Sequence, residues 1–163
     1  MNYDWVVYVD LDGVVAAFEE KCQVILNGTF DTLHKSKVWA GIQHYNDNVQ
    51  PFFESLDKMS DADVLMDYVR TNFGNVRILS ACGFTPKDAG DQKRRWCEKH
   101  YGKDLIVKIV SKSPDKAQYA APNAILIDDR SKSIDPWVAA GGIGVLHTSA
   151  ETTIARLREI IGV

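Results

Sequence analysis

The sequence predicts an α/β fold in which a doubly wound, mostly parallel sheet is covered by helices on both faces. Short apolar, β-branched runs alternate with longer segments of helical periodicity. Acidic residues directly follow two of these runs, and active sites in such sheets lie at the carboxyl ends of the strands. The length of 163 residues favours a single domain, 1–163, with at most an inserted subdomain.

Five apolar runs are predicted to be the strands of this sheet. The first, residues 5–9 (Trp-Val-Val-Tyr-Val), is almost continuously apolar, as is typical of a strand buried on both faces. The others are residues 76–79, 105–110, 124–127 and the shorter 143–146. We expect right-handed crossovers between them, because parallel neighbours in one sheet are almost always connected in that way.

Helix signals lie between the strands. Apolar residues recur at three- to four-residue spacing from Ala62 to Phe73, and again near the end of the chain. In two segments a hydroxyl residue precedes a proline, which favours a capped helix with proline in the first position. The predicted start signals are Ser60 with Asp63, Thr85-Pro86, Ser113-Pro114, and Thr148 with Glu151.

The regular alternation breaks between residues 14 and 56. This stretch opens with a helix-like pattern and then becomes aromatic and polar. We interpret 14–56 as a small helical cap inserted after the first strand, with residues 1–13 and 57–163 forming the core. Its aromatic residues are Phe18, Trp39, Tyr45, Phe52 and Phe53.

The composition argues against several classes of function. A formal net charge of −3 provides no broad basic field, so duplex nucleic acid is not expected as a partner. No apolar run approaches the roughly 20 residues that span a bilayer, and the first residues lack a signal-type pattern, so we expect a cytoplasmic protein without membrane contact. The three cysteines are far apart and are expected to be free thiols. The oligomeric state stays open, a homodimer included.

Two acidic pairs carry the chemistry that the sequence predicts. Asp10 and Asp12 follow the first strand, and Asp128-Asp129 follow the fourth. Four carboxylates at one sheet edge would repel one another unless a cation neutralised them. Hard oxygen ligands of this kind select Mg²⁺ over zinc. We therefore predict a magnesium site formed by Asp10, Asp12, Asp128 and Asp129.

The strand after the cap ends in Ser80, whose hydroxyl and following backbone N–H groups, from Ala81 onward, are suited to hold phosphate oxygens. A serine at this place is also a common turn residue. Lys116, early in the helix after Ser113-Pro114, is expected to add positive charge near Asp10. Lys112 is the alternative, and Lys116 is favoured.

This ordered set of motifs resembles the haloacid dehalogenase superfamily: Asp-x-Asp-Gly-Val, a serine after the second strand, a lysine and an Asp-Asp pair. The resemblance covers nearly the whole chain and implies a Rossmann-like core. It implies that Asp10 is the nucleophile that forms an aspartyl-phosphate and that Asp12 is the general acid and base. Mg²⁺ would be bound by Asp10, the backbone carbonyl of Asp12 and either Asp128 or Asp129, with Asp129 favoured.

Within that superfamily the chain is similar to the 5'(3')-deoxyribonucleotidases. The similar segments are 10–19, 51–53, 95–100 and 125–130. The resemblance implies a nucleoside monophosphate as substrate, its base stacked on Phe18 and on Phe52 or Phe53. Trp39 is a further candidate from its place in the cap, and the alternative is that these aromatic residues form a small core of the cap itself. It also places a lysine at Lys93 on the substrate side. The sequence departs from the family's Thr-Ser-Pro at residues 80–82, where it has Ser-Ala-Cys.

Three other functions compete with this interpretation. The cap sets the substrate, so a sugar-phosphate phosphatase or a polynucleotide 3'-phosphatase would keep the same chemistry. A phosphorylated, receiver-like switch domain also uses clustered Asp, Ser and Lys around Mg²⁺. Motif order argues against it, because Asp10 and Asp12 share one loop that a cap follows.

Overall fold

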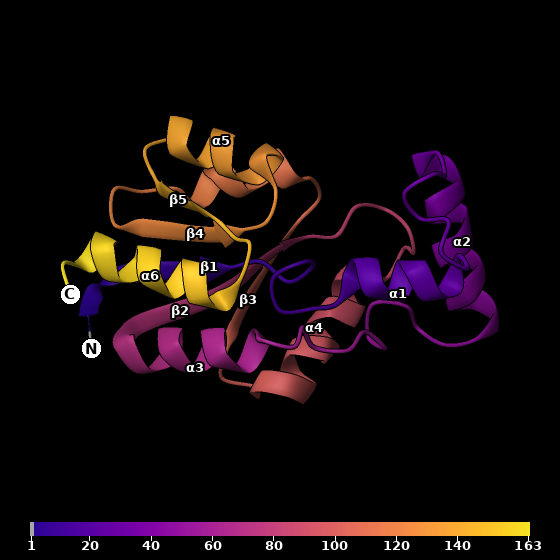
Figure 1. The fold of residues 1–163 in the computed structure, drawn as a ribbon, viewed down its shortest axis with the longest axis horizontal. Coiled ribbons are helices and arrows are strands. Elements are labelled where there is room, and N and C mark those ends of the chain that lie inside the picture. The colour runs from indigo at the N-terminus through magenta and orange to yellow at the C-terminus, as the bar shows by residue number, and fades with distance from the viewer. Residues whose placement is uncertain (1) are drawn as a thin grey trace.

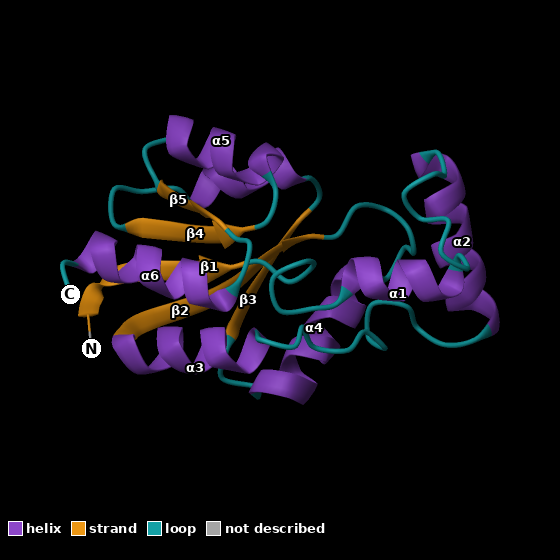
Figure 2. Ribbon diagram, in the orientation of Figure 1, coloured by secondary structure: helices purple, strands orange, loops and turns teal. Residues whose placement is uncertain are grey.

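The computed structural model describes residues 2–163 and shows a layered α/β core with two helices to one side (Figure 1). Five strands form one all-parallel sheet in the order β3-β2-β1-β4-β5 (Figure 2). Their bounds are β1 (Asn2–Val9), β2 (Phe73–Ala81), β3 (Ile106–Val110), β4 (Ala124–Asp128) and β5 (Ile143–Leu146). The predicted α/β fold and its five strands are confirmed.

Helices cover both faces of the sheet. One face packs against α3 (Ala62–Asn72), α4 (Ala89–Tyr101) and α6 (Ala150–Ile161), and the other against the 3₁₀-helix η1 (Ser113–Tyr119) and α5 (Ser131–Ala139). Successive strand residues alternate between the two cores: Ile125 and Ile127 face one, and Leu126 the other. All three are fully buried, and each such side chain stabilises the fold by roughly 1.5–3 kcal/mol.

Several predicted helix starts are corrected by the structure. The N-cap residue of α3 is Asp61, and Phe73, expected on this helix, opens β2. Asp63 forms an ion pair with Lys58 at 2.7 Å. The N-cap residue of α6 is Ser149, whose hydroxyl accepts from the Thr152 N–H, one residue after the predicted Thr148. Capping side chains thus occur close to the predicted ends but not always at the predicted residue.

The two hydroxyl–proline signals behave differently from the prediction. Helix α4 begins only at Ala89, with Asp88 as its N-cap residue, and a turn that includes the cis peptide Thr85-Pro86 precedes it. Ser113 and Pro114 do open a helix, but it is the 3₁₀-helix η1 and its N-cap residue is Lys112. Proline tolerates both settings, because its missing N–H costs nothing in a turn or a first helical turn.

The inserted segment contains two helices, α1 (Phe18–Ile25) and α2 (Lys35–Asn48), which lie beyond the carboxyl ends of the strands (Figures 1 and 2). The chain that enters this segment and the chain that leaves it run side by side. The Ala17 N–H donates to the Asp57 carbonyl at 2.9 Å, and the Met59 N–H donates to the Val15 carbonyl at 2.8 Å. The two connections therefore form one paired hinge, which carries α1 and α2 above the sheet edge.

Two further observations concern the chain as a whole. Across residues 2–163, none of the helices is both long and apolar enough to cross a membrane. Cys22, Cys82 and Cys97 are free thiols within the described chain.

Candidate active site

Three carboxylates meet where β1 and β4 end. These strands are neighbours in the sheet, and the Asp10 N–H donates to the Ile127 carbonyl at 3.0 Å, which places Asp10 beside the end of β4. Oxygens of Asp10, Asp128 and Asp129 all lie within 4.8 Å of one another. Asp10 and Asp128 are buried and Asp129 is half-buried. Three of the four predicted carboxylates therefore meet at the carboxyl ends of β1 and β4, whereas the Asp12 carboxylate, on the loop that follows, is not part of this group and is bound by Lys93 instead.

Lys116 of η1 lies between two of these carboxylates. Its Nζ is 2.9 Å from Asp10 Oδ1 and 2.6 Å from Asp128 Oδ2, and the side chain is 2% exposed. Burial by itself lowers the pKa of Lys116, but Asp10 and Asp128 outweigh it and the pKa is raised. The alternative, Lys112, is exposed. The structure thus places Lys116, and not Lys112, beside Asp10.

Burial and mutual repulsion destabilise the charged forms of these carboxylates when no cation is bound. Burial raises the pKa of Asp10 to about 6. The positive charge of Lys116 lowers this pKa, and the negative charge of Asp128 raises it. Burial, followed by the charges of Asp10 and Asp128, raises the pKa of Asp129 to about 7. Asp129 Oδ1 is buried and has no hydrogen-bond partner among residues 2–163. A divalent cation at this site would offset the repulsion between the carboxylates.

Gly13 allows this arrangement. A Cβ atom at this position would lie 2.0 Å from Asp129 Oδ2, so any other residue would displace the carboxylate. The φ angle of Gly13 is +80°, in the left-handed region that favours glycine. The glycine of the Asp-x-Asp-Gly motif therefore shapes the acidic cluster as well as the turn.

Lys93 of α4 differs from its predicted role as a substrate contact. Its Nζ donates to Asp12 Oδ2 at 2.9 Å, to Ser80 Oγ at 2.9 Å and to the Ala81 carbonyl at 2.7 Å. An ammonium has three N–H donors, and these three acceptors use them all. With 2% of the residue exposed, Lys93 retains no donor for a substrate phosphate.

Two of the backbone N–H groups after Ser80 are already paired, whereas phosphate binding by the Ala81 N–H stays a prediction. The N–H groups of Cys82 and Gly83 donate to the carbonyls of Val110 and Ser111, at 2.9 and 3.0 Å. They extend the pairing of β2 with β3 beyond the strand ends and are not free to bind phosphate. The Ser80 hydroxyl remains next to Asp12, because Lys93 holds both side chains.

The aromatic residues proposed to hold a base form one cluster with unequal access to solvent. Phe52 and Phe53 are 0% and 2% exposed and act as core residues, so neither offers a free face to a base in this structure. Phe18 is half-buried, and its ring stacks on Phe53 with centroids 6.1 Å apart and planes at 12°. Trp39 is 37% exposed and lies 6.1 Å from Phe18, so the accessible aromatic surface belongs to Phe18 and Trp39.

A buried polar network that the sequence analysis missed fixes this aromatic cluster to α4. The Phe53 N–H donates to Gln92 Oε1 at 2.9 Å, and Gln92 Nε2 donates to Asn46 Oδ1 at 2.9 Å. The Trp96 indole N–H donates to the Leu56 carbonyl at 2.7 Å. Gln92 and Trp96 are four residues apart on one helical face, and that spacing is the sequence signal that could have indicated a docking surface.

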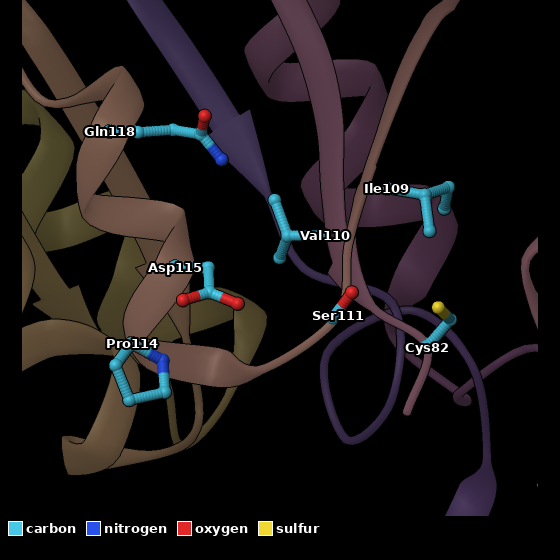
Figure 3. A pocket seen from close by; sticks show the side chains of 7 residues that line it. All are labelled: Cys82, Ile109, Val110, Ser111, Pro114, Asp115 and Gln118. Carbon is cyan, nitrogen blue, oxygen red and sulfur yellow. The ribbon is translucent and has the colours of Figure 1, made fainter. Parts of the chain in front are cut away.

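A pocket of about 550 Å³ lies at the end of β3, between this strand and η1 (Figure 3). Ile109, Val110 and Cys82 line it from the strand side, and Asp115 and Gln118 line it from η1. Cys82 belongs to the segment that directly follows Ser80. The lining of this pocket thus includes Cys82 but none of Asp10, Asp128 and Asp129.

Comparisons with known proteins reveal the same fold in solved structures of hydrolases. No protein-family model and no curated protein matches the chain. A hydrolase from Streptococcus pneumoniae is similar over 100% of both chains, with 19% identity and a TM-score of 0.55. A hydrolase from Pseudomonas syringae is similar over 93% of this chain and 89% of its own, with 11% identity and a TM-score of 0.56.

A HAD-family hydrolase from Deinococcus radiodurans, solved with bound phosphate and sodium, is similar over 98% of this chain and 95% of its own, with 16% identity and a TM-score of 0.55. At identities this low, a structural similarity speaks for architecture and not for activity. The chain therefore has the α/β architecture found in these hydrolases.

Proposed function

We propose that the chain is a phosphomonoesterase of the haloacid dehalogenase type in which Asp10 attacks the phosphorus of a phosphate ester. The observation that carries this proposal is the position of Asp10: a buried carboxylate at the end of a central strand, 2.9 Å from the Lys116 ammonium and beside a second acidic pair. A nucleophilic carboxylate needs a fixed orientation and a positive field that offsets the charge of the incoming phosphate. Lys116 supplies both.

The proposed reaction has two steps that Asp10 and Asp12 share. In the first, a bond forms between an Asp10 oxygen and phosphorus, the bond from phosphorus to the ester oxygen breaks, and Asp12 gives its proton to the leaving alcohol. In the second, Asp12 takes a proton from water, the water oxygen forms a bond to phosphorus, and the bond from phosphorus to the Asp10 oxygen breaks, which releases inorganic phosphate and restores the Asp10 carboxylate. Burial raises the pKa of Asp12, although the positive charge of Lys93 lowers it. The raised pKa favours the protonated form of Asp12 that the first step requires.

The donor set supports Mg²⁺ as the cofactor. Asp10, the backbone carbonyl of Asp12 and Asp129 are the ligands we propose, all of them hard oxygen donors. Asp129 is preferred over Asp128, because both Asp128 oxygens are already engaged as hydrogen-bond acceptors whereas Asp129 Oδ1 is buried without a partner in the described chain. When bound, the cation would neutralise charge on the phosphate and on these carboxylates.

We further propose that the substrate is a nucleoside or deoxynucleoside monophosphate. The support is the resemblance to 5'(3')-deoxyribonucleotidases together with the half-buried ring of Phe18 and the more exposed ring of Trp39 on the insertion above the sheet edge. Aromatic faces of this kind stack on bases of any sequence. Sugar phosphates and 3'-phosphorylated oligonucleotides are the alternatives that an assay has to include.

A phosphate-release assay tests the proposal. The protein is incubated with Mg²⁺ and a panel of nucleoside 5'- and 3'-monophosphates, sugar phosphates and 3'-phosphorylated oligonucleotides. Asp10→Asn should lower the turnover number by about 10³-fold or more, because the amide is a poor nucleophile. Asp135→Asn, an exposed aspartate of α5, is the matched control and should retain full activity. EDTA should abolish turnover and Mg²⁺ should restore it.

Two results would overturn the proposal. An Asp10→Asn variant with more than a tenth of wild-type activity would exclude the nucleophile. Full activity in EDTA would exclude the metal site.

A further inference from the structure

Lys93 is a buried cation with three converging acceptors, and these come from separate parts of the site. Asp12 lies on the loop after β1, whereas Ser80 and Ala81 end β2. The distances of 2.7–2.9 Å are those of charge-assisted hydrogen bonds, which are roughly twice as strong as neutral ones. Because every donor is used, Lys93 cannot act on a phosphate directly. Its effect has to pass through the groups that it holds.

The consequence for Asp12 is a fixed carboxyl orientation. Lys93 holds Oδ2 at 2.9 Å, while Oδ1 is buried and has no hydrogen-bond partner in the part of the chain that the structure describes. One oxygen is thus anchored and the other is left for a group that enters the site. A general acid needs this kind of positioning, because proton transfer requires the carboxyl group within hydrogen-bond reach of the leaving oxygen.

The consequence for Ser80 is a fixed direction of its hydroxyl proton. Ser80 Oγ accepts a hydrogen bond from Lys93, and the residue is 1% exposed. A hydroxyl has one donor and two acceptor sites, so acceptance from Lys93 turns the O–H away from the ammonium. The hydroxyl proton is then free to donate to a phosphate oxygen.

Lys93 also contacts the inserted segment. Its Nζ lies 4.6 Å from the centroid of the Phe53 ring, which is within the range of a cation–π interaction. The preceding residue, Gln92, accepts from the Phe53 N–H. Helix α4 therefore holds the chain that leaves the insertion with one residue and the Asp12–Ser80 pair with the next.

We propose that Lys93 is a positioning residue that fixes Asp12 for proton transfer and Ser80 for phosphate binding, and that connects both to the inserted segment through Phe53. This inference rests on the proposed phosphatase function. It assigns to Lys93 a role in the step that protonates the leaving group, with no contact to the substrate. It predicts that loss of Lys93 harms the enzyme most when the leaving group is poor.

The test compares two probes of similar shape, phenyl phosphate and p-nitrophenyl phosphate. Phenolate is the poorer leaving group and depends more on the acid Asp12 than p-nitrophenolate does. In Lys93→Met, kcat for phenyl phosphate should fall by about 10²-fold, within the range for a lost general acid, and kcat for p-nitrophenyl phosphate by less than about tenfold. Lys99→Met, an exposed lysine of the same helix, is the matched control and should change neither rate.

A double variant shows whether Lys93 acts through Asp12. If it does, Lys93→Met combined with Asp12→Asn should be no slower with phenyl phosphate than Asp12→Asn alone, within about threefold, because effects of coupled residues do not add. Should Lys93→Met not fold by circular dichroism, Lys93→Arg carries the test. It keeps the charge, but its planar fork cannot direct three N–H groups at these acceptors, so it should show the same preference for the better leaving group in weaker form.

The inference and the proposed function fail in different ways. Equal losses with the two esters, or fully additive losses in the double variant, would overturn the positioning role while Asp10→Asn stays inactive. Activity that survives Asp10→Asn would instead overturn the phosphatase mechanism itself.

Discussion

Replacing Lys116 with methionine removes the ammonium that lies between Asp10 and Asp128, and the size of the effect can be worked from the structure. Lys116 and Asp128 are 2% and 0% exposed in their side chains, and Asp10 is 7% exposed. Breaking a buried ion pair on one side costs about 3–5 kcal/mol, because the remaining charge stays desolvated without a partner. Here two carboxylates lose the same partner, so we expect a loss near 4 kcal/mol in metal-free buffer.

This free energy corresponds to a large change in the melting temperature. The entropy of unfolding is about 2.1 cal/mol/K per residue. For 163 residues it amounts to about 0.34 kcal/mol/K, so a loss of about 4 kcal/mol lowers Tm by about 12 °C. Thermal unfolding followed by circular dichroism in EDTA at pH 8 measures this difference. Lys112→Met, which removes an exposed lysine four residues away, should change the free energy of unfolding by no more than about 0.5 kcal/mol.

The pH dependence gives an independent check. The pKa of Asp10 is already raised to about 6 by burial, and without Lys116 it rises further. A carboxyl group with a raised folded-state pKa binds more protons in the folded than in the unfolded protein, so the free energy of unfolding falls as pH rises through the folded pKa. The Lys116→Met variant should therefore recover much of its deficit at pH 5.5, where Asp10 is protonated.

Two outcomes would refute this reasoning. A Tm loss below about 3 °C for Lys116→Met at pH 8 would mean that the buried carboxylates do not depend on Lys116. A deficit that grows on acidification would have the wrong sign for carboxylates that remain charged and unpaired at pH 8.

Three further predictions concern other parts of the molecule. If Mg²⁺ binds as proposed, it should raise the Tm of the wild type, and Gly13→Ala should lose that rise because its Cβ displaces Asp129. Gly28→Ala, with φ +78° and no described atom within 4 Å, should keep the rise. Phe18→Ala should lower kcat/KM for a nucleoside monophosphate by a factor that corresponds to about 1–3 kcal/mol, but should change kcat/KM for p-nitrophenyl phosphate little. Equal losses with the two substrates would assign Phe18 to packing alone. Burial and the nearby Lys99 and Lys58 lower the pKa of His100. As pH falls below about 6.5, His100 is therefore protonated in the unfolded state before it is protonated in the folded state, which lowers the free energy of unfolding. His100→Phe should therefore lose less Tm than the wild type between pH 7.5 and pH 5.5, and an equal loss would contradict that assignment.

The strands were predictable because each carries a local signal that packing confirms. Residues 124–127 are apolar without interruption, and β4 is buried on both faces as that pattern indicates. The helices α2 and α5, whose periodicity is weak, were not predicted as separate elements. In α2, the structure shows two buried residues, Val38 and Ile42, and two are too few to give the sequence a clear apolar face. In α5, Pro136 interrupts an otherwise helical pattern, yet tertiary packing against the sheet maintains the helix.

The candidate site was predictable in part. The positions of Asp10, Asp128 and Asp129 follow from strand ends in a parallel sheet, and a single helical turn leads from Ser113-Pro114 to Lys116. The contacts of Lys93 were not predictable, because Lys93 stands next to Arg94 and Arg95 in the sequence, and such a run of basic residues usually faces solvent. The burial of Phe52 and Phe53 depends on how α4 docks against the insertion, which is a long-range property.

The paired hinge at Val15–Ala17 and Asp57–Met59 has a consequence for how such a chain can diversify. The hydrogen bonds between these two segments hold the ends of about forty intervening residues next to each other. For the folding of the sheet, the insertion is then equivalent to a short closed loop, and loop-closure entropy changes only slowly when such a loop grows or shrinks. Residues 18–45 could accordingly be exchanged for another segment of different length with little penalty to the sheet, while Asn46 and 51–57 must stay to dock on α4. Recombination at this hinge would join the same sheet and acidic cluster to many different insertions.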